Sequence, residues 1–417
     1  MKNESGFLNQ SIKTFIGFYV LIYIFPFPVN HFPYGYMLIS QHIDSAKGSL
    51  SLLVGKYVLG FENLEYVPLN GSGDTTLDYI SLVSYGLLAA LISMAVLFLV
   101  RNKSRLDQFY HLILIYVRYF VGLTLISYGV IKFLQGQFPS PSYLALESTY
   151  GDFSPMGLAW RFFGYSDLYK GFMGVAETMA GLLLLIRRTQ LLGALISITV
   201  TANIFLVNLS FDVPVKLFSG HLLFFSLLIA LPYLRSLIDF FLFHKPSQLT
   251  SIAYPLTNKW KKIIYWGTKA YFVGLVPFGL LLGHIQSQEF RTYPNEWEGV
   301  YEITESELTG SEISGRFSKW EKIIIQGKSI ICVSKNRERE SYIIDNIWNE
   351  GEINFISQQD QENPYTLSVS KMDDVLFSLT FEMGERNARF LTKRKLKNDY
   401  LLINRGFHWI NESPFNR

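Results

Sequence analysis

Long apolar segments recur along the chain and are separated by short polar segments. At about 1.5 Å of rise per residue, most of them are long enough to cross a hydrocarbon core of about 30 Å. The pattern therefore predicts an all-α membrane bundle of about seven transmembrane helices. The predicted spans are 14–29, 79–100, 110–134, 168–186, 191–209, 217–234 and 263–283.

From Trp297 onward the pattern changes to short β-branched and aromatic runs, such as KIIIQGKSIICV and YTLSVS, separated by Gly, Asn and charged residues. Alternation with period two is typical of strands. We predict a small antiparallel β domain that folds alone. The resulting division has two N-terminal helices with an outer loop (1–110), a four-helix core (111–234), a connector with the last helix (235–284) and the β domain (285–417).

Basic residues concentrate in alternate loops, at Arg101, Arg187 and Arg235, whereas acidic residues such as Glu62 and Asp167 lie in the others. Positive charge favours the cytoplasmic side of a membrane. We therefore expect a multi-pass protein of the bacterial inner membrane. Its N-terminus is predicted to be cytoplasmic and its C-terminal domain periplasmic.

Composition narrows the function classes. The 417 residues have a mean hydropathy of +0.20 and 16% aromatic residues, which favours a lipid bilayer as the solvent. The net charge is +3, from 37 basic and 34 acidic residues that are not massed in one run, so nucleic acid is not an expected partner. A single cysteine, Cys332, excludes an internal disulfide, a CxxC relay and a cysteine metal cage.

Charged side chains inside hydrocarbon are costly, so each one in a predicted span is a candidate functional residue. Arg118 and Glu177, in the third and fourth spans, both lie roughly 15 to 20 Å from the inner helix ends. We predict a direct ion pair between these two residues on facing helices. Two hypotheses stay open: a structural pair that locks the helices, or a site for a ligand or proton.

Glycines accompany these charges on one stripe of each helix, where they let two backbones approach closely. The stripes are Arg118, Gly122, Gly129 and Lys132 on the third span, and Lys170, Gly174, Glu177 and Gly181 on the fourth.

Two more polar residues lie at a similar height in the next two spans. Asn203 and His221 are each roughly 20 Å from the inner ends, and we expect them to share a hydrogen bond. No second histidine stands at ligand spacing, so no metal is predicted. Lys132 is expected near the outer surface, where its long side chain reaches the interface; the alternative is a role in substrate binding.

Three outer loops, NGSGDTT, GDFSPMGLAWRFFGYSD and NLSFDVPVK, contribute Asp74, Asp152, Asp212 and Lys216 to one predicted mouth. In the first loop, an Asp or Thr is suited to cap the following helix. The second loop has an alternative interpretation as an amphipathic anchor at the interface. Neither of the first two loops is a nucleotide-binding motif, because no strand-to-helix Gly fingerprint or GK[ST] accompanies it.

The run RYFVGLTLISYGVIK from Arg118 to Lys132, followed by GVAETMAGLLLLIRRTQLLGALI from Gly174, resembles the DoxX family of bacterial membrane proteins. The likeness covers residues 111–234. NGSGDTT, FSPMGLAW, FDVPVKLFSGH and RGFHWINESPFNR resemble a fused DoxX-like subgroup of Bacteroidota, with extra helices and an extracytoplasmic tail. The resemblance implies a four-helix bundle and a membrane subunit associated with quinone-linked sulfur or thiol oxidation.

Three functions stay open, and the sequence does not decide whether the protein is an enzyme. The first is a DoxX-like membrane subunit whose outward-facing pocket binds a quinone or another lipid-soluble molecule, with Arg118, Glu177 and His221 as polar contacts and a periplasmic or membrane redox partner. The second is a small-molecule transport protein. The third is a non-enzymatic scaffold that docks a periplasmic partner through its β domain.

Overall fold

The computed structural model describes residues 2–29, 32, 34–65, 71–100, 102–133, 136–246, 248–249, 258–291, 296–309, 317–347, 352–357, 365–383 and 386–416. The chain forms two compact units. The helical unit contains Met1–Pro139 and Ser154–His284, and the barrel unit contains Ser140–Phe153 and Ile285–Arg417.

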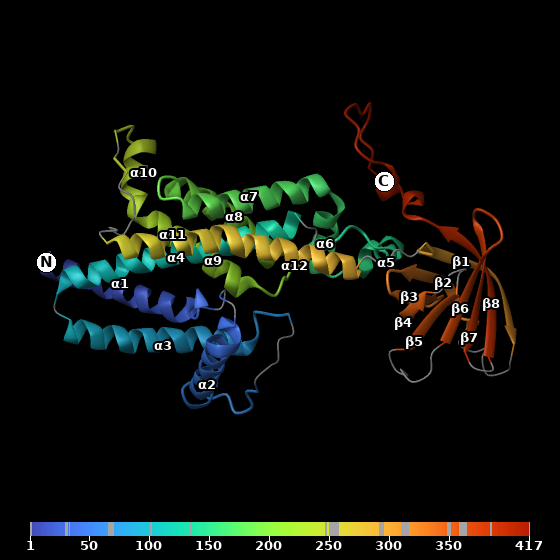
Figure 1. Ribbon diagram of the computed structural model, residues 1–417, viewed down its shortest axis with the longest axis horizontal. Coiled ribbons are helices and arrows are strands. Elements are labelled where there is room, and N and C mark those ends of the chain that lie inside the picture. Colours follow the sequence, from blue (N-terminus) through green and yellow to red (C-terminus); the bar gives the residue numbers. More distant parts are fainter. Residues whose placement is uncertain are drawn as a thin grey trace. The chain divides into compact units, whose positions relative to one another are not determined.

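The helical unit is a bundle of long helices that run alongside one another (Figure 1). Its elements are α1 Lys2–Ile24, η2 Tyr36–Ser40, α2 Gln41–Tyr57, α3 Thr76–Leu99, α4 Lys103–Phe133, α6 Pro155–Tyr165, α7 Asp167–Leu185, α8 Gln190–Ser210, α9 Lys216–Ala230, η4 Leu231–Tyr233, α10 Leu234–Phe241, α11 Lys259–Ala270, η5 Tyr271–Leu275 and α12 Val276–Arg291. Among the described residues, five helices are long and apolar enough to cross a membrane. They are Thr76–Leu99, Lys103–Phe133, Asp167–Leu185, Gln190–Ser210 and Lys216–Phe241.

Helices α2, α6 and α10 of this unit lie in segments expected to be loops or connectors, and α10 follows the sixth predicted span. Helix α2 follows η2 between the first two predicted spans. Helix α6 occupies the loop read as GDFSPMGLAWRFFGYSD: the Ser154 hydroxyl accepts the backbone N–H of Gly157, and Pro155 stands at the first helical position. This N-cap signal was present in the sequence. The aromatic composition of the loop obscured it.

The tightest helix contact joins α4 to α7 through two pairs of facing glycines. A Cβ atom built on Gly181 would lie 2.4 Å from the carbonyl oxygen of Gly122, and one built on Gly174 would lie 2.9 Å from that of Gly129. Backbones this close leave no room for a side chain. The predicted approach of the two glycine stripes is confirmed.

Eight antiparallel strands close a barrel within the described part of the second unit (Figure 1). They are β1 Gly299–Thr309, β2 Trp320–Gln326, β3 Ser329–Ser334, β4 Arg339–Ile347, β5 Glu352–Ser357, β6 Tyr365–Lys371, β7 Leu376–Met383 and β8 Arg386–Lys395. Pairing of β1 with β8, from Val300 opposite Lys395 to Thr309 opposite Asn387, completes the closure. Large rings such as Tyr301, Trp320 and Phe381 fill the interior, as expected of a small barrel.

The barrel packs on a segment from between the membrane helices. Residues Ser140–Phe153, which include α5 Tyr143–Glu147 and η3 Tyr150–Asp152, belong to the barrel unit, although the sequence assigned them to the helical core. The Glu147 carboxylate accepts hydrogen bonds from Lys322 (2.5 Å), Tyr400 (2.5 Å) and Lys395 (3.2 Å). That the β domain folds alone stays a prediction, and its folded form includes this partner from outside residues 285–417.

A test of the α4–α7 contact is Gly181→Ala. The new methyl group meets backbone, which cannot rotate away, so we expect a loss of about 1–3 kcal/mol of stability, measured by thermal unfolding in detergent. Gly171→Ala on the same helix is the control, because a Cβ there meets nothing within 4 Å. Equal effects of the two changes would contradict the close contact.

A second test concerns Glu147 and acid. Burial acts to raise the pKa of Glu147, but the hydrogen bonds from Lys322 and Tyr400 and the charge of Lys322 outweigh it and lower that pKa. A lowered folded-state pKa stabilises the barrel above the ordinary carboxyl pKa of about 4.3, and this stabilisation is lost as the pH falls through the folded value. Glu147→Gln should therefore weaken the barrel at neutral pH and flatten its acid dependence, followed by near-ultraviolet circular dichroism.

The expected loss for Glu147→Gln at neutral pH is about 2 kcal/mol, the scale of hydrogen bonds to a charged group. Glu305→Gln, at an exposed position of β1, should leave both the stability and its acid dependence unchanged. An acid midpoint that is the same for Glu147→Gln and the unaltered protein would show that the carboxylate does not hold the barrel.

Candidate functional site

A buried ion pair joins α4 to α7. Lys132 Nζ lies 2.7 Å from Glu177 Oε1 and 2.8 Å from Oε2, so the ammonium bridges both carboxylate oxygens. The two side chains are only 5% and 3% exposed. The pair is therefore a charge-neutral unit inside a segment apolar enough to span a membrane.

The predicted ion pair between Arg118 and Glu177 is wrong, since Glu177 pairs with Lys132. Arg118 is buried and donates from Nη1 to the side-chain oxygen of Gln190 at the start of α8. Gln190 Nε2 in turn donates to the Tyr233 hydroxyl. Arg118, at the middle of α4, thus joins a separate polar group.

Helix direction explains the exchange of partners. Side chains lean toward the N-terminus of their own helix, and the facing pairs Gly122 with Gly181 and Gly129 with Gly174 show that α4 and α7 are antiparallel. Lys132 therefore leans along α4 toward the level of Glu177, while Glu177 leans toward Lys132. Arg118 also leans toward the N-terminus of α4, but it starts on the N-terminal side of the Glu177 level and so leans away from Glu177. Cα heights alone do not contain this tilt.

Lys132 lies in the last turn of α4, but its side chain does not extend to the interface as expected. Its ammonium lies within 6 Å of the Tyr128 and Phe138 rings as well as on Glu177. A side chain enclosed in this way does not reach the interface. The pairing explains why a lysine is tolerated there, because the opposite charge and the rings replace water.

A cavity of about 410 Å³ lies between α4, α6, α7 and α8, and the ion pair forms part of its wall. Most of the wall is apolar, as is usual for small-molecule sites. The apolar lining includes Phe138, Trp160, Phe163, Phe172, Met173 and Val200, and the polar lining includes Lys132, Gln137, Glu177, Thr199, Asn203 and Asn208.

Packing around residue 138 fixes one end of this cavity. The ring of Phe138 meets Trp160 edge-on, with centroids 5.2 Å apart. Lys170, which is 1% exposed, donates to the Phe138 carbonyl at 3.3 Å and pairs with Asp167 at 2.7 Å. A buried lysine thus holds the segment after α4 against α7.

The predicted hydrogen bond between His221 and Asn203 is wrong, because the two residues line different cavities and His221 bonds to other partners. His221 Nδ1 lies 2.7 Å from the Leu217 carbonyl oxygen and Nε2 lies 2.7 Å from the Tyr19 hydroxyl. A carbonyl only accepts, so Nδ1 carries the proton and Nε2 accepts from Tyr19. The imidazole also stacks on Tyr23, with centroids 4.0 Å apart. His221 faces a second cavity of about 470 Å³, while Asn203 lines the first.

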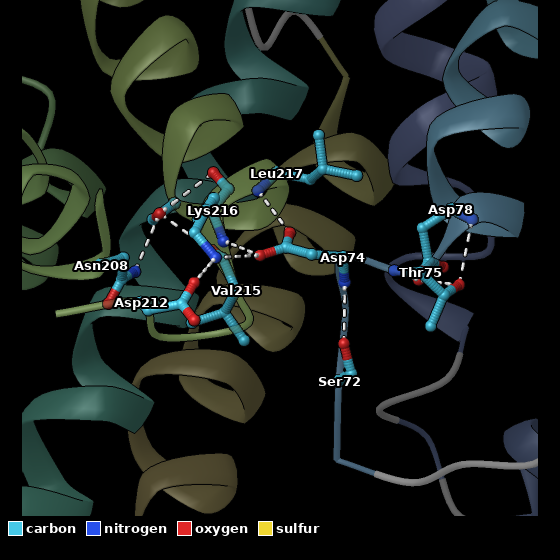
Figure 2. A network of polar contacts seen from close by, with 10 residues as sticks. Ser72, Asp74, Thr75, Asp78, Asn208, Asp212, Val215, Lys216 and Leu217 are labelled. Carbon is cyan, nitrogen blue, oxygen red and sulfur yellow. Dashed lines mark hydrogen bonds and ion pairs between the residues drawn. The ribbon is translucent and has the colours of Figure 1, made fainter. Parts of the chain in front are cut away.

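The predicted mouth residues Asp74, Asp212 and Lys216 come together (Figure 2). The Asp74 carboxylate, 7% exposed, accepts the backbone N–H groups of Lys216 (2.7 Å) and Leu217 (2.9 Å). Lys216 Nζ lies 2.9 Å from Asp212 and 3.7 Å from Asp74. Asp74 therefore caps α9 from a distant loop, where a carboxylate favours a helix N-terminus.

The loop containing Asp74 also caps its own helix, as the sequence suggested. The Thr75 hydroxyl accepts the Asp78 N–H, and Asp78 Oδ2 accepts the Thr75 N–H at 2.8 Å, which completes a capping box on α3 (Figure 2). Asp152, the fourth predicted mouth residue, belongs to the barrel unit. There it accepts from Thr149 and pairs with Arg337 at 3.4 Å.

Sequence reasoning missed Gln190 and Tyr19. Gln190 is 2% exposed and binds the buried guanidinium, and Tyr19 binds His221. For Gln190, the available signal was a polar residue directly after the basic turn between α7 and α8. No sequence signal identified Tyr19. Within the described residues no group of three or more His, Cys, Asp or Glu is placed to hold a metal ion.

The coupling between the paired charges can be measured. Lys132→Met leaves Glu177 as a buried charge without its ammonium, so we expect a loss of about 3–5 kcal/mol. Lys132→Met combined with Glu177→Leu should recover most of it in a double-mutant cycle of thermal unfolding in detergent. The parallel cycle of Arg118→Leu with Glu177→Leu should be additive. Coupling in the second cycle but not the first would restore the original pairing.

The chain is similar to the uncharacterized protein YwoB of Bacillus subtilis, with 38% identity over 112 residues. These are 27% of this chain and 71% of YwoB. No family model matches the chain. No solved structure matches it either.

Proposed function

The chain belongs to the family of the uncharacterized protein YwoB, and we propose that it is an integral membrane protein that binds a small lipid-soluble molecule in the α4–α6–α7–α8 cavity. The observation that carries this proposal is the buried Lys132–Glu177 pair in the wall of an otherwise apolar cavity. An ion pair inside hydrocarbon is costly, and a purely structural contact between α4 and α7 is already supplied by the glycine pairs.

The same pair suits ligand binding in two respects. It offers donors and acceptors at one point of a site that is otherwise lined by rings and aliphatic groups, which is the composition that orients a ligand. It also keeps the site neutral, so that binding does not expose an isolated charge.

The membrane arrangement extends the proposal. We propose seven crossings in a bacterial inner membrane, with α1 and the continuous run α11–η5–α12 added to the five helices of sufficient length and apolarity. The basic inner loops support a cytoplasmic N-terminus and a periplasmic barrel. In that orientation the cavity, near the C-terminal ends of α4 and α8, opens toward the outer leaflet.

The resemblance to DoxX supports one candidate ligand, a quinone, and one role, a redox-associated membrane subunit. A second function, docking of a periplasmic protein by the barrel unit, is favoured by the tail after α14 Leu401–Asn404. There Phe407, Trp409 and Ile410 are 76%, 90% and 79% exposed. Large exposed apolar groups of this kind mark interaction surfaces.

The test is purification in nanodiscs, followed by mass spectrometry of bound small molecules and proteins. Ala176 lines the cavity, so Ala176→Phe fills it and should remove a molecule that copurifies with the unaltered protein. Val175→Phe is the control, since its side chain is 43% exposed on the same helix and does not line the cavity.

Retention of the molecule by Ala176→Phe, or absence of any bound molecule from the unaltered protein, would contradict binding in this cavity. A stoichiometric protein partner without a small molecule would favour the docking function instead.

A further inference from the structure

One polar residue of the cavity wall, Asn203, is exposed at the surface of the helix bundle. Asn203 lines the cavity on α8 and is exposed, and its amide makes no hydrogen bond to any residue in the part of the chain that the structure describes. Thr199, one turn earlier, is also exposed and lines the same cavity. The amide therefore faces outward from the bundle at the edge of a hollow.

This position lies within the membrane-spanning part of α8. Asn203 is 13 residues from Gln190 and 7 from Ser210 along the helix, or about 20 Å and 10 Å from its ends. The side chain is too short to reach water at either interface. An amide without a partner in hydrocarbon costs free energy, and replacement by leucine would remove that cost. Its presence requires a partner that comes from the membrane.

The ion pair in the cavity wall determines which head group can bind the Asn203 amide. Lys132 and Glu177 neutralise each other there. An anionic head group would compete for the ammonium and leave a buried carboxylate, and a cationic one would compete for the carboxylate, so either is disfavoured. A neutral carbonyl or hydroxyl group can bond to the Asn203 amide and leave the ion pair intact.

The surroundings also indicate a lateral route. Phe172, which lines the cavity beside Ala176, is 66% exposed, and Leu206 on α8 is 59% exposed. The hollow is thus bordered by rings and aliphatic groups that face lipid. A ligand with an apolar body passes from lipid into such a border without crossing water.

We propose that the ligand is a neutral amphiphile with a carbonyl or hydroxyl head group, that it enters sideways from the bilayer, and that Asn203 is the residue that recognises its head. This inference rests on the proposed function and specifies the ligand class and the entry route for the same cavity.

The test uses two photoactivatable probes of equal chain length, a diazirine-bearing fatty alcohol and the matching fatty acid. Each is added to the full chain in phosphatidylcholine nanodiscs at a pH at which the acid is ionised. Cross-linked peptides are identified by mass spectrometry. The alcohol should label residues that line the cavity, the acid should label them weakly, and unlabelled alcohol should compete.

Asn203→Leu should lower labelling by the alcohol about fivefold, the factor expected for one lost hydrogen bond. It should not impair folding, because it replaces an exposed amide with a side chain suited to lipid. Thr199→Val is the second variant and should lower labelling less, because the Thr199 hydroxyl already donates to the Leu195 carbonyl. Leu192→Ala, at a 52% exposed position of α8 outside the cavity, should change nothing.

Equal labelling by alcohol and acid, or unchanged labelling in Asn203→Leu, would overturn the inference. So would conversion of an oligomer to a monomer by Asn203→Leu with labelling unchanged, because the amide would then pair with a second copy of the chain. If Ala176→Phe removes the copurifying molecule and blocks labelling while Asn203→Leu does neither, only the ligand class and its recognition are wrong. If Ala176→Phe has no effect on either readout, the proposed function itself is wrong.

Discussion

The helical unit depends on one constraint, that a charge inside an apolar bundle must be matched by an opposite charge at contact distance. Lys132 and Glu177 satisfy it across α4 and α7. The match is made where Gly122, Gly129 and their partners bring the two backbones together. Charge pairing accompanies this close approach, because without the pair the same approach would enclose an unmatched charge.

The charged residues and the glycines of this contact could be identified from the sequence, but the partner of Glu177 could not. The apolar runs and the alternating C-terminal segments predict a membrane helix bundle followed by a small antiparallel β domain, because both depend on periodicity that is local in the chain. The stripes of glycine and charge are equally local, and their contact is confirmed. The partner of Glu177 depends on side-chain tilt and helix register, which cannot be read from Cα heights. The capping of α9 by Asp74 and the bond from Tyr19 to His221 join residues 142 and 202 positions apart. No local pattern encodes such pairs.

The barrel unit also matches a buried carboxylate with positive charges, but there the positive charges remain in contact with solvent. Glu147 has three donors and a side chain that is 9% exposed, yet its lysine partners remain 27% and 33% exposed. Solvent shares the stabilisation of these charges, so the group can titrate with acid. The segment that provides Glu147 begins at Ser140, two residues after the cavity residue Phe138 in the chain. One short stretch thus lines the proposed ligand site with its first residues and joins the barrel with its next ones.

Charge matching also limits which proton transfers and which ligand charges the site favours. Lys132 and Glu177 carry no net charge together, and the cavity wall around them is largely apolar. A ligand that takes a proton from Lys132 becomes a cation beside Glu177 and replaces the ammonium as its partner. A ligand that gives a proton to Glu177 becomes an anion beside Lys132 in the same way. In both cases the total charge of the enclosed site is unchanged, so proton transfer avoids the penalty of an isolated ion. Binding of a preformed ion does not conserve that charge, and the pair therefore disfavours it while leaving proton exchange with a neutral ligand open.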